Sequence, residues 1–397
     1  MRAWRGRLLL LAGSVGAALL LAELGLRLAA PQPTGATPFV EHPTLVTRMA
    51  PGASGRISLP GVYAYRWAHD ADGMRTAGRS LDGRSPDDDV AEGSVLILGD
   101  SFAYGMGVEA DETLASRLSE SLGTRGANVR VRNGAAVGKG PAYALRLLET
   151  VGRSWRGDAV VYVFYPNDFA NLRHRRYAGL GPTGHLVHPR GDAPNVRRRA
   201  RLGNLPGMRW VAERSHVAGL VRRAALAAAG ANGLGPETVD LDTTATPVAY
   251  HTADVLPLAG EVFAALDSTV QARGGRLITL YAPSAAEVAY TRRTGAPSAD
   301  ERAFDRVRRT LGLDGVTTTP ALAASEWAVG QLYYPEIHWR PPAHALAAST
   351  VLDPVQAAVC ERDLSRRGCD RAPEAVRRTA AMRARPAGES TRRTPAD

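Results

Sequence analysis

Short apolar stretches of strand length alternate with longer helix-like stretches through the middle of the chain. The strand-like stretches are rich in valine, isoleucine, leucine or threonine, and they occupy residues 94–98, 128–132, 159–164, 276–281 and 315–319. The helix-like stretches occupy residues 111–123, 141–153, 255–273 and 343–351. Strands that alternate with helices form parallel sheets covered on both faces. We therefore expect an α/β fold, a three-layer α/β/α sandwich with a central parallel sheet, over residues 93–356.

Three regions lie outside this alternation, and we interpret them as additions to one large domain. Residues 31–92 are rich in proline, glycine, aspartate and serine, which favours a stalk and a loop-rich extension. Residues from roughly 170 to 250 are rich in arginine and glycine, with a helix-like run over 208–229. We expect this insertion, after the third strand, to overhang the carboxyl edge of the sheet. Residues 357–397 are rich in arginine and poor in apolar residues, which predicts a disordered tail.

The first 30 residues are predicted to form a transmembrane signal anchor. Arginines near the amino terminus precede an uncharged stretch of leucine, alanine, glycine and valine that continues to Ala22. This stretch reaches the length of a spanning helix if Glu23 and Arg27 lie at its outer end. Arginines before the span favour a cytoplasmic amino terminus. A cleaved signal peptide is the alternative, although Pro31 directly follows the small residues where cleavage would take place. In both cases the globular part leaves the cytoplasm.

The net charge of +10 does not indicate a nucleic-acid partner. Nearly all of the basic residues are arginine, with Lys139 as the only lysine, and much of the basic excess lies near the two ends of the chain. No basic stretch is interleaved with aromatic residues in the manner of a nucleic-acid-binding module.

The cysteine and histidine positions predict no metal centre. Cys360 and Cys369 are the only cysteines, and outside the cytoplasm they would close a small loop in the tail. His174, His185 and His188 have no carboxylate or cysteine at ligand spacing. Since phosphate- and dinucleotide-binding glycine motifs are also missing from the sequence, we expect neither a metal nor an organic cofactor.

A candidate nucleophile follows the first predicted strand. The apolar residues 94–98 lead into Gly99, Asp100 and Ser101, so the strand would end and present a serine at its carboxyl end. Open α/β sheets place their reactive side chains at that edge. A serine hydroxyl is a weak nucleophile at neutral pH and needs a base within hydrogen-bond reach.

Three further motifs lie in equivalent positions. The second predicted strand is followed by a glycine loop over residues 133–140, the third by Tyr-Pro-Asn-Asp at 165–168, and a late histidine precedes the last helix. This ordered set resembles the SGNH/GDSL hydrolase superfamily, whose four marks correspond here to Ser101, Gly138, Asn167 and His338. The resemblance covers residues from about 95 to 352 and implies a flavodoxin-like order of strands.

The resemblance also implies a role for each of these residues. His338 would be the base that activates Ser101. The negative charge of the tetrahedral intermediate would be bound by the backbone N–H groups of Ser101 and Gly138 and by the side-chain amide of Asn167. The glycines at positions 134 and 140 of the same loop are alternatives to Gly138.

The acceptor that orients the base departs from the family pattern. The superfamily more often has an aspartate two or three residues before the histidine, whereas position 335 here is proline and Glu336 lies two residues ahead of His338. Glu336 is our candidate for the third member of the triad, and a backbone carbonyl is the alternative. Asp100 and Asp168 are expected to support their loops rather than to react.

These residues predict a membrane-anchored, extracytoplasmic serine esterase that cleaves an acyl ester through an acyl-serine intermediate. Two alternatives remain open. With a sugar hydroxyl as acceptor, the same site would be an O-acyltransferase for exported polysaccharides, as in anchored relatives of this superfamily. The departure at Glu336 also leaves a catalytically degenerate, glycan-binding domain. The expected partners are an acyl ester or acylated carbohydrate and the membrane.

Overall fold

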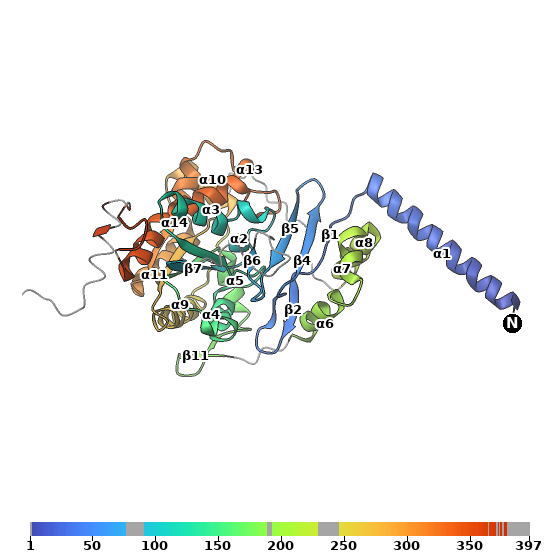
Figure 1. Cartoon of the computed structure of the whole chain (residues 1–397), viewed down its shortest axis with the longest axis horizontal. Helices are drawn as coiled ribbons and strands as arrows, with labels where there is room; N and C mark the ends of the chain where they lie inside the picture. Colours follow the sequence, from blue (N-terminus) through green and yellow to red (C-terminus); the bar gives the residue numbers. More distant parts are fainter. Residues whose placement is uncertain are drawn as a thin grey trace, which may run out of the picture.

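A mixed sheet of nine strands runs through the computed structural model, which describes residues 2–76, 91–188, 193–228, 246–363, 365–370, 372, 374, 377 and 378 (Figure 1). Its parallel part contains, in spatial order, β8 (Val129–Asn133), β7 (Gly93–Gly99), β9 (Ala159–Phe164), β12 (Arg276–Tyr281) and β13 (Asp314–Thr317). Counted along the chain, this is the flavodoxin-like order 2-1-3-4-5. The predicted α/β fold is confirmed.

Helices cover both faces of the parallel strands. One face packs against α3 (Leu114–Thr124) and α14 (Pro341–Arg362), and the other against α4 (Pro141–Glu149) and α9 (Leu256–Gln271) (Figure 1). Successive side chains of a strand point to opposite faces. The odd-numbered Val161 of β9 therefore joins the core beneath α3 and α14, and its neighbour Val160 joins the core beneath α4 and α9. Both faces are buried, which explains why these strands are apolar throughout.

Further helices complete this domain. They are α2 (Ser101–Tyr104), α5 (Asn167–Arg173), α10 (Ala285–Thr294), α11 (Ala299–Thr310), α12 (Thr319–Ala324) and α13 (Val329–Leu332), with single 3₁₀ turns at Ala110–Glu112 and Val151–Ser154. The apolar pattern did not predict α10 and α11, which lie between the fourth and fifth parallel strands. Each begins at a serine cap, Ser284 or Ser298, whose side chain accepts a hydrogen bond from a backbone N–H in the first turn.

The loop-rich extension expected over residues 31–92 is wrong for its described part. Residues 34–76 instead form β1 (Thr34–Gly35), β2 (Phe39–His42), β3 (Val46–Met49), β4 (Ser54–Leu59), β5 (Tyr63–His69) and β6 (Arg75–Thr76). Strands β6, β5, β4 and β1 continue the main sheet beyond β8 as antiparallel partners. The physical reason is the alternation in β5, where Tyr65, Trp67 and His69 are buried and the residues between them are not. Residues 77–90 of the extension lie outside the described part.

The insertion contains more structure than the one predicted helix. It comprises β10 (Gly179–Leu180), β11 (Leu186–Val187), α6 (Pro194–Gly203), α7 (Met208–Arg214) and α8 (His216–Ala228). The three helices pack against the extension: α6 against β2 and β3, α7 against β1 and β4, and α8 against β1 and α1 (Arg2–Ala29). The overhang expected for the whole insertion is therefore wrong for α6 to α8, because their packing partners are the extension strands. Residues 189–192 and 229–245 lie outside the described part.

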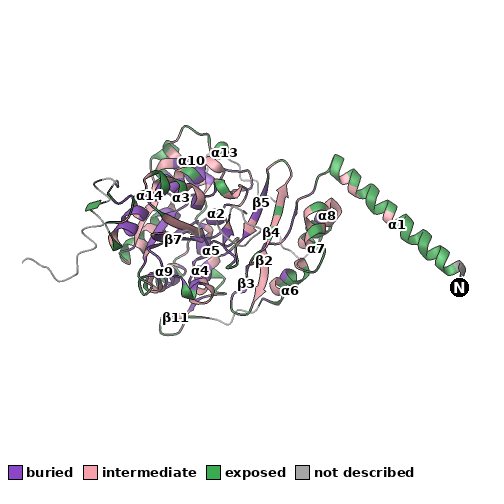
Figure 2. Ribbon diagram, viewed as in Figure 1, coloured by how far each residue is buried: buried purple, intermediate pink, exposed green. Residues whose placement is uncertain are grey.

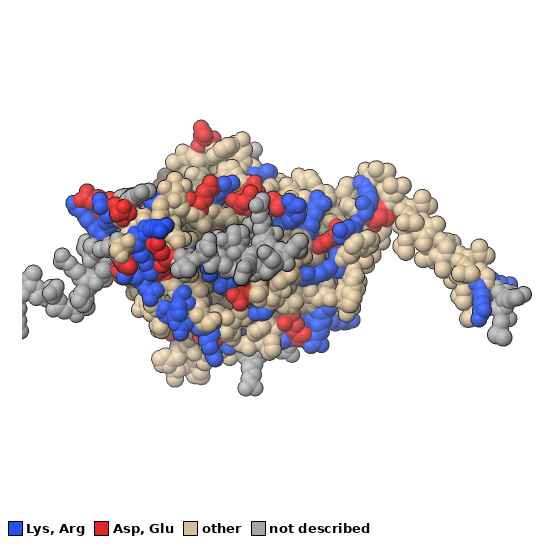
Figure 3. Space-filling model, viewed as in Figure 1, with Lys and Arg blue, Asp and Glu red and all other residues tan. Residues whose placement is uncertain are grey.

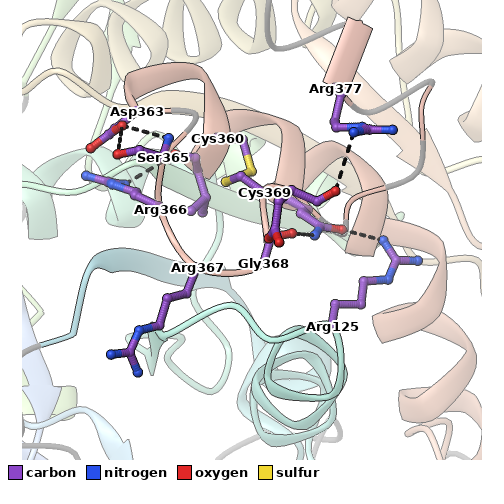
Figure 4. Close-up of a disulfide and its surroundings, with 12 residues drawn as sticks. Arg125, Cys360, Asp363, Ser365, Arg366, Arg367, Gly368, Cys369 and Arg377 are labelled. Carbon is purple, nitrogen blue, oxygen red and sulfur yellow. Dashed lines mark hydrogen bonds between the residues drawn. A yellow bond between two sulfur atoms is a disulfide. The ribbon is translucent and has the colours of Figure 1, made fainter.

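The two ends of the described chain differ sharply. Helix α1 projects from the body with its side chains exposed, and among the described residues it is the one helix long and apolar enough to cross a membrane (Figure 2). At the other end, α14 continues to Arg362, and a disulfide joins Cys360 to Cys369 (Figure 4). The Gln356 amide donates to Gly368 O over 2.9 Å. The predicted disorder is therefore wrong for residues 357–363 and 365–370, since the disulfide and these contacts fix them, while residues 379–397 lie outside the described part.

Candidate active site

Ser101 lies where β7 ends at the carboxyl edge of the sheet. Gly99 has a φ of 145°, and a Cβ there would lie 2.7 Å from Val163 O and 2.8 Å from the Cβ of Ala103, so the tight exit from the strand requires glycine. Asp100 then caps α2, because its Oδ1 accepts a hydrogen bond from Phe102 N over 2.9 Å. Ser101 is the first residue of that helix and is 7% exposed.

His338 and Glu336 lie beside this serine, although 235 or more residues separate them in sequence. The Oγ of Ser101 is 2.8 Å from Nε2 of His338, and Nδ1 of the same ring is 2.5 Å from Oε2 of Glu336. The backbone N–H of His338 also donates to that carboxylate oxygen, over 3.3 Å. The three side chains thus form one continuous hydrogen-bonded chain, with each of the three residues at most 8% exposed. The structure brings together all three members of the predicted triad.

An unusual backbone conformation between the two residues produces this arrangement. Ile337 has a φ of 96°, a value that β-branched residues rarely adopt. The loop around it is closed by hydrogen bonds from Tyr334 N to His338 O, over 2.7 Å, and from Ile337 N to Tyr334 O, over 3.0 Å. The kink lets the side chains of residues 336 and 338 meet through one carboxylate oxygen. Strain of this kind persists where surrounding contacts hold it, and it is typical of functional sites.

Aromatic packing holds the imidazole in place. The ring of Phe102, the residue after the serine, stacks on Tyr165 with centroids 3.8 Å apart and lies 5.2 Å from the ring of His338. Trp339 meets Phe102 edge to face. Because these rings are buried, the imidazole has little freedom to turn away from Ser101.

The glycine loop after β8 continues the pairing with β7. Gly134 N donates to Ile97 O over 2.9 Å, and Ala136 N donates to Gly99 O over 3.0 Å. The N–H of Gly134 is therefore occupied, which removes this glycine as an alternative oxyanion donor. Lys139 N donates to Ala136 O over 3.1 Å, so residues 136–139 form a turn whose third residue, Gly138, has a φ of 67°. A type II turn needs this conformation at that position, and glycine adopts it without cost.

The side chain of Lys139 ties this loop to two other parts of the chain. Its ammonium group donates to Thr47 Oγ1 over 3.1 Å and to the hydroxyl of Tyr177 over 3.0 Å, and it lies 5.2 Å from the ring centroid of Tyr143. Burial lowers the pKa of this amine to about 8. The extension and the insertion therefore both support the loop that contains Gly138. Gly138, Tyr143 and Tyr177 also line a small cleft beside this loop.

Asn167 follows β9 and begins α5, next to the serine loop. Burial raises the pKa of the Asp100 carboxyl in that loop to about 6, and the Asn167 side chain is among the groups that oppose this shift. Asp168 is also fully buried and accepts from the hydroxyl of Tyr162 over 3.0 Å and from Tyr165 N over 3.3 Å. Burial and the neighbouring Asp100 raise its pKa well above the usual range. These contacts fit the expected supporting role of the two aspartates.

Arg75, in β6, supports the site although the sequence motifs did not mark it. Its buried guanidinium donates to the carbonyl of Tyr104 over 2.7 Å, to that of Val108 over 2.5 Å, and to that of Gly105. The carbonyls of Tyr104 and Gly105 end the short helix that begins at Ser101, and a cation there offsets the partial negative charge of the helix end. The carbonyl of Val108 lies in the turn that follows. Arg75 therefore helps to position Ser101 by holding the opposite end of the same short helix. A basic residue shortly before the nucleophile strand is too weak a signal to predict such a contact.

Replacing Arg75 is expected to lower kcat far more than KM. In the Arg75→Met protein, three carbonyls lose the hydrogen bond from the guanidinium, and α2 can shift. A shift of about 1 Å at a reacting group costs up to roughly 100-fold in rate. Arg75→Lys should recover part of the loss because it keeps a cation. Steady-state kinetics on a soluble ester would measure this, with the exposed Arg66→Met as the matched control. A folded Arg75→Met protein with wild-type kcat would remove Arg75 from the positioning machinery.

Solved structures with a similar fold include several ester- and lipid-hydrolysing enzymes. The structure of TesA matches with 14% identity and a TM-score of 0.38, over 67% of this chain and 99% of its own. The esterase EstA from Pseudoalteromonas sp. matches with 11% identity and a TM-score of 0.34, over 65% of this chain and 93% of its own. No family model matches the chain, and no curated protein matches its sequence. A third match, with 11% identity and a TM-score of 0.32 over 66% of this chain and 96% of its own, is a Veillonella parvula protein of the lipolytic G-D-S-L family.

Proposed function

We propose that this protein is a serine esterase of the SGNH/GDSL type. The observation that carries the proposal is the hydrogen-bonded chain from Ser101 Oγ through His338 to Glu336. A serine needs such a base to become nucleophilic, and the base needs an acceptor that fixes its tautomer. All three groups are held by buried backbone at the carboxyl edge of a parallel sheet, where α/β proteins bind their ligands.

The reaction proceeds in two balanced halves. Ser101 Oγ attacks the ester carbonyl carbon while Nε2 of His338 takes the hydroxyl proton, and Glu336 stabilises the resulting imidazolium. The tetrahedral intermediate collapses to an acyl-serine, and the alcohol leaves with the proton from His338. Water then attacks the acyl carbon, gives a proton to His338, and the acid is released as Ser101 regains its proton.

The oxyanion is bound by groups from three neighbouring loops. We assign this role to the backbone N–H groups of Ser101 and Gly138 and to the side-chain amide of Asn167. The assignment is supported by the turn that gives Gly138 its left-handed conformation and by the positions of the three residues just after β7, β8 and β9. Each such donor contributes about 10²–10³ in rate to serine acyl transfer.

An ester assay with active-site labelling tests this function. The purified full chain should hydrolyse short p-nitrophenyl esters, and an organophosphonate should inactivate it while adding one phosphonyl group to Ser101, as read by peptide mass spectrometry. The same assay with added oligosaccharide alcohols measures transfer against hydrolysis. A folded protein that neither turns over esters nor reacts with the phosphonate would leave only the glycan-binding alternative.

We further propose that α1 anchors the protein with its catalytic domain outside the cytoplasm. Arg5 and Arg7 lie at the amino-terminal end of the apolar helix, which favours retention of that end in the cytoplasm (Figure 3). The disulfide between Cys360 and Cys369 supports the same orientation, because disulfides persist in oxidising compartments.

The orientation predicts that protease added to intact spheroplasts of an expressing bacterium digests the catalytic domain. A cytoplasmic marker protein should survive the same treatment. Protection of the domain until the spheroplasts are lysed would reverse the proposed orientation.

A further inference from the structure

The membrane helix is joined to the insertion by a well-defined contact near its outer end. The carboxylate of Glu23 accepts hydrogen bonds from Ser215 Oγ and from the backbone N–H groups of His216 and Val217, at 2.9 to 3.0 Å. His216 and Val217 are the first residues of α8 and Ser215 directly precedes them, so the side chain of Glu23 in α1 caps the start of another helix. Arg27 adds a hydrogen bond to Arg214 O over 2.6 Å. The contact fixes the direction in which α1 leaves the body, beside α7 and α8 (Figure 1).

Helices α6 to α8 expose a set of large apolar side chains on their outer surface. We call this set the apolar patch; it consists of Leu202, Leu205, Met208, Trp210, Leu220 and Val221, each between 42% and 62% exposed. The inner faces of the three helices are already occupied by the extension strands and by α1. These helices lie on the side of the body from which α1 projects (Figure 1), and the exposed side chains of the patch are among those that these packing partners leave uncovered. Large exposed apolar side chains that gather on one segment of the chain are typical of interaction surfaces.

The charge of the same segment favours one class of partner. Residues 194–228 contain eight arginines and one acidic residue, Glu213. Trp210 is 62% exposed, and the guanidinium of Arg214 lies 5.5 Å from its ring centroid. Exposed tryptophan and leucine together with arginine are typical of helices that lie in the headgroup region of a bilayer, and anionic lipids attract such basic segments.

We propose that the apolar patch rests on the outer lipid leaflet from which α1 emerges, and that its partner is the anionic phospholipid surface. The proposal depends on the membrane anchoring proposed above. It adds that the domain is docked on the bilayer at a fixed orientation and does not swing freely on α1. The Glu23 contact joins α1 to the start of α8, which carries part of the apolar patch. Insertion of α1 therefore brings the outer surfaces of α7 and α8 to the headgroup layer.

Site-specific fluorescence quenching in nanodiscs tests the docking. The full chain would carry one added cysteine, Val221→Cys, labelled without reductant so that the disulfide stays closed, in discs of phosphatidylcholine and phosphatidylglycerol. A quencher attached near the lipid headgroup should quench this label at least about threefold more than a label at the matched exposed position Trp327→Cys, outside the apolar patch. Aqueous iodide should show the opposite order.

A third label separates the docking from the anchoring. A label at Leu10→Cys, in α1, reports whether the helix lies in the bilayer. Quenching at Leu10→Cys but not at Val221→Cys by the lipid quencher would overturn the docking and leave the anchoring intact. Absence of lipid quenching at Leu10→Cys would overturn the anchoring and the docking with it. Protection of Val221→Cys from iodide only in discs that hold two copies would overturn the docking in favour of contact between copies.

The Glu23 contact provides a second variant. Glu23→Ala removes the cap from α8, so lipid quenching of the Val221→Cys label should fall while quenching at Leu10→Cys and hydrolysis of a soluble ester stay unchanged. Glu120→Ala, which removes an exposed acid from α3, is the matched control. Unchanged quenching at Val221→Cys in the Glu23→Ala protein would show that this contact does not hold the patch on the bilayer, and would overturn that part of the proposal.

Discussion

Ser101→Ala is expected to abolish ester hydrolysis while leaving the fold and its stability nearly unchanged. The substitution removes the hydroxyl oxygen that lies 2.8 Å from His338 Nε2, and loss of the nucleophile in serine enzymes costs on the order of 10⁶ in kcat. The removed atom is small, so packing against Phe102 and His338 is retained. Burst kinetics with a p-nitrophenyl ester, together with thermal unfolding, would measure both effects.

Another serine provides the matched control for that experiment. Ser349 lies exposed on α14 and donates only to Leu346 O, so Ser349→Ala should keep wild-type kcat and full phosphonate labelling. Equal turnover by the Ser101→Ala and Ser349→Ala proteins would exclude Ser101 as the nucleophile and would end the esterase assignment in its present form.

Glu336→Gln is expected to lower kcat by up to about 10⁴, because an amide cannot stabilise the imidazolium and can select the wrong tautomer of His338. His338→Ala should cost at least as much, since no base then remains for Ser101. The double variant should be little slower than His338→Ala alone, because residues that act as one unit are not additive. Double-mutant kinetics on the same ester, with unfolding curves for each protein, would give these values.

The alternative acceptor for the histidine makes a different prediction. If a backbone carbonyl orients His338, Glu336→Gln should slow the enzyme by less than about tenfold while His338→Ala still inactivates it. A Glu336→Asp protein sharpens the comparison, since it keeps the charge but shortens the reach to Nδ1. Near-wild-type rates for Glu336→Gln would leave a Ser101–His338 dyad.

The parallel strands could be predicted from the sequence because burial on both faces leaves a strong apolar signal. β9 and β12 begin and end at the predicted residues, and the other three differ by one or two positions. The antiparallel strands of the extension were missed because their signal is alternation, which is visible in the aromatic positions of β5 but is flanked by turn-forming residues. The serine caps of α10 and α11, each followed three positions later by glutamate, were a local helix-start signal that the apolar pattern alone did not use.

The sequence predicted the residues of the candidate site, but it did not predict the backbone conformation and the long-range contacts that hold them. Ser101, Gly138 and Asn167 each follow a strand whose end the apolar pattern marks, and His338 precedes the last predicted helix. The meeting of Glu336 with Nδ1 depends on the left-handed backbone at Ile337, which no propensity for isoleucine would predict. Long-range contacts such as those of Arg75 with the end of α2 arise from tertiary packing, and a single sequence contains no periodic signal for them.

The single lysine of this chain allows selective chemical modification at one position. Lys139 is the only lysine, it is 7% exposed, and its amine is held by Thr47 and Tyr177 on the outer side of the glycine loop. Amine-directed reagents such as succinimidyl esters therefore have, in the folded protein, one shielded side-chain target besides the chain terminus. Because burial shields this amine from the reagent, its modification requires the loop to open. The acylation rate of Lys139 thus reports how often the loop beside the reactive serine opens.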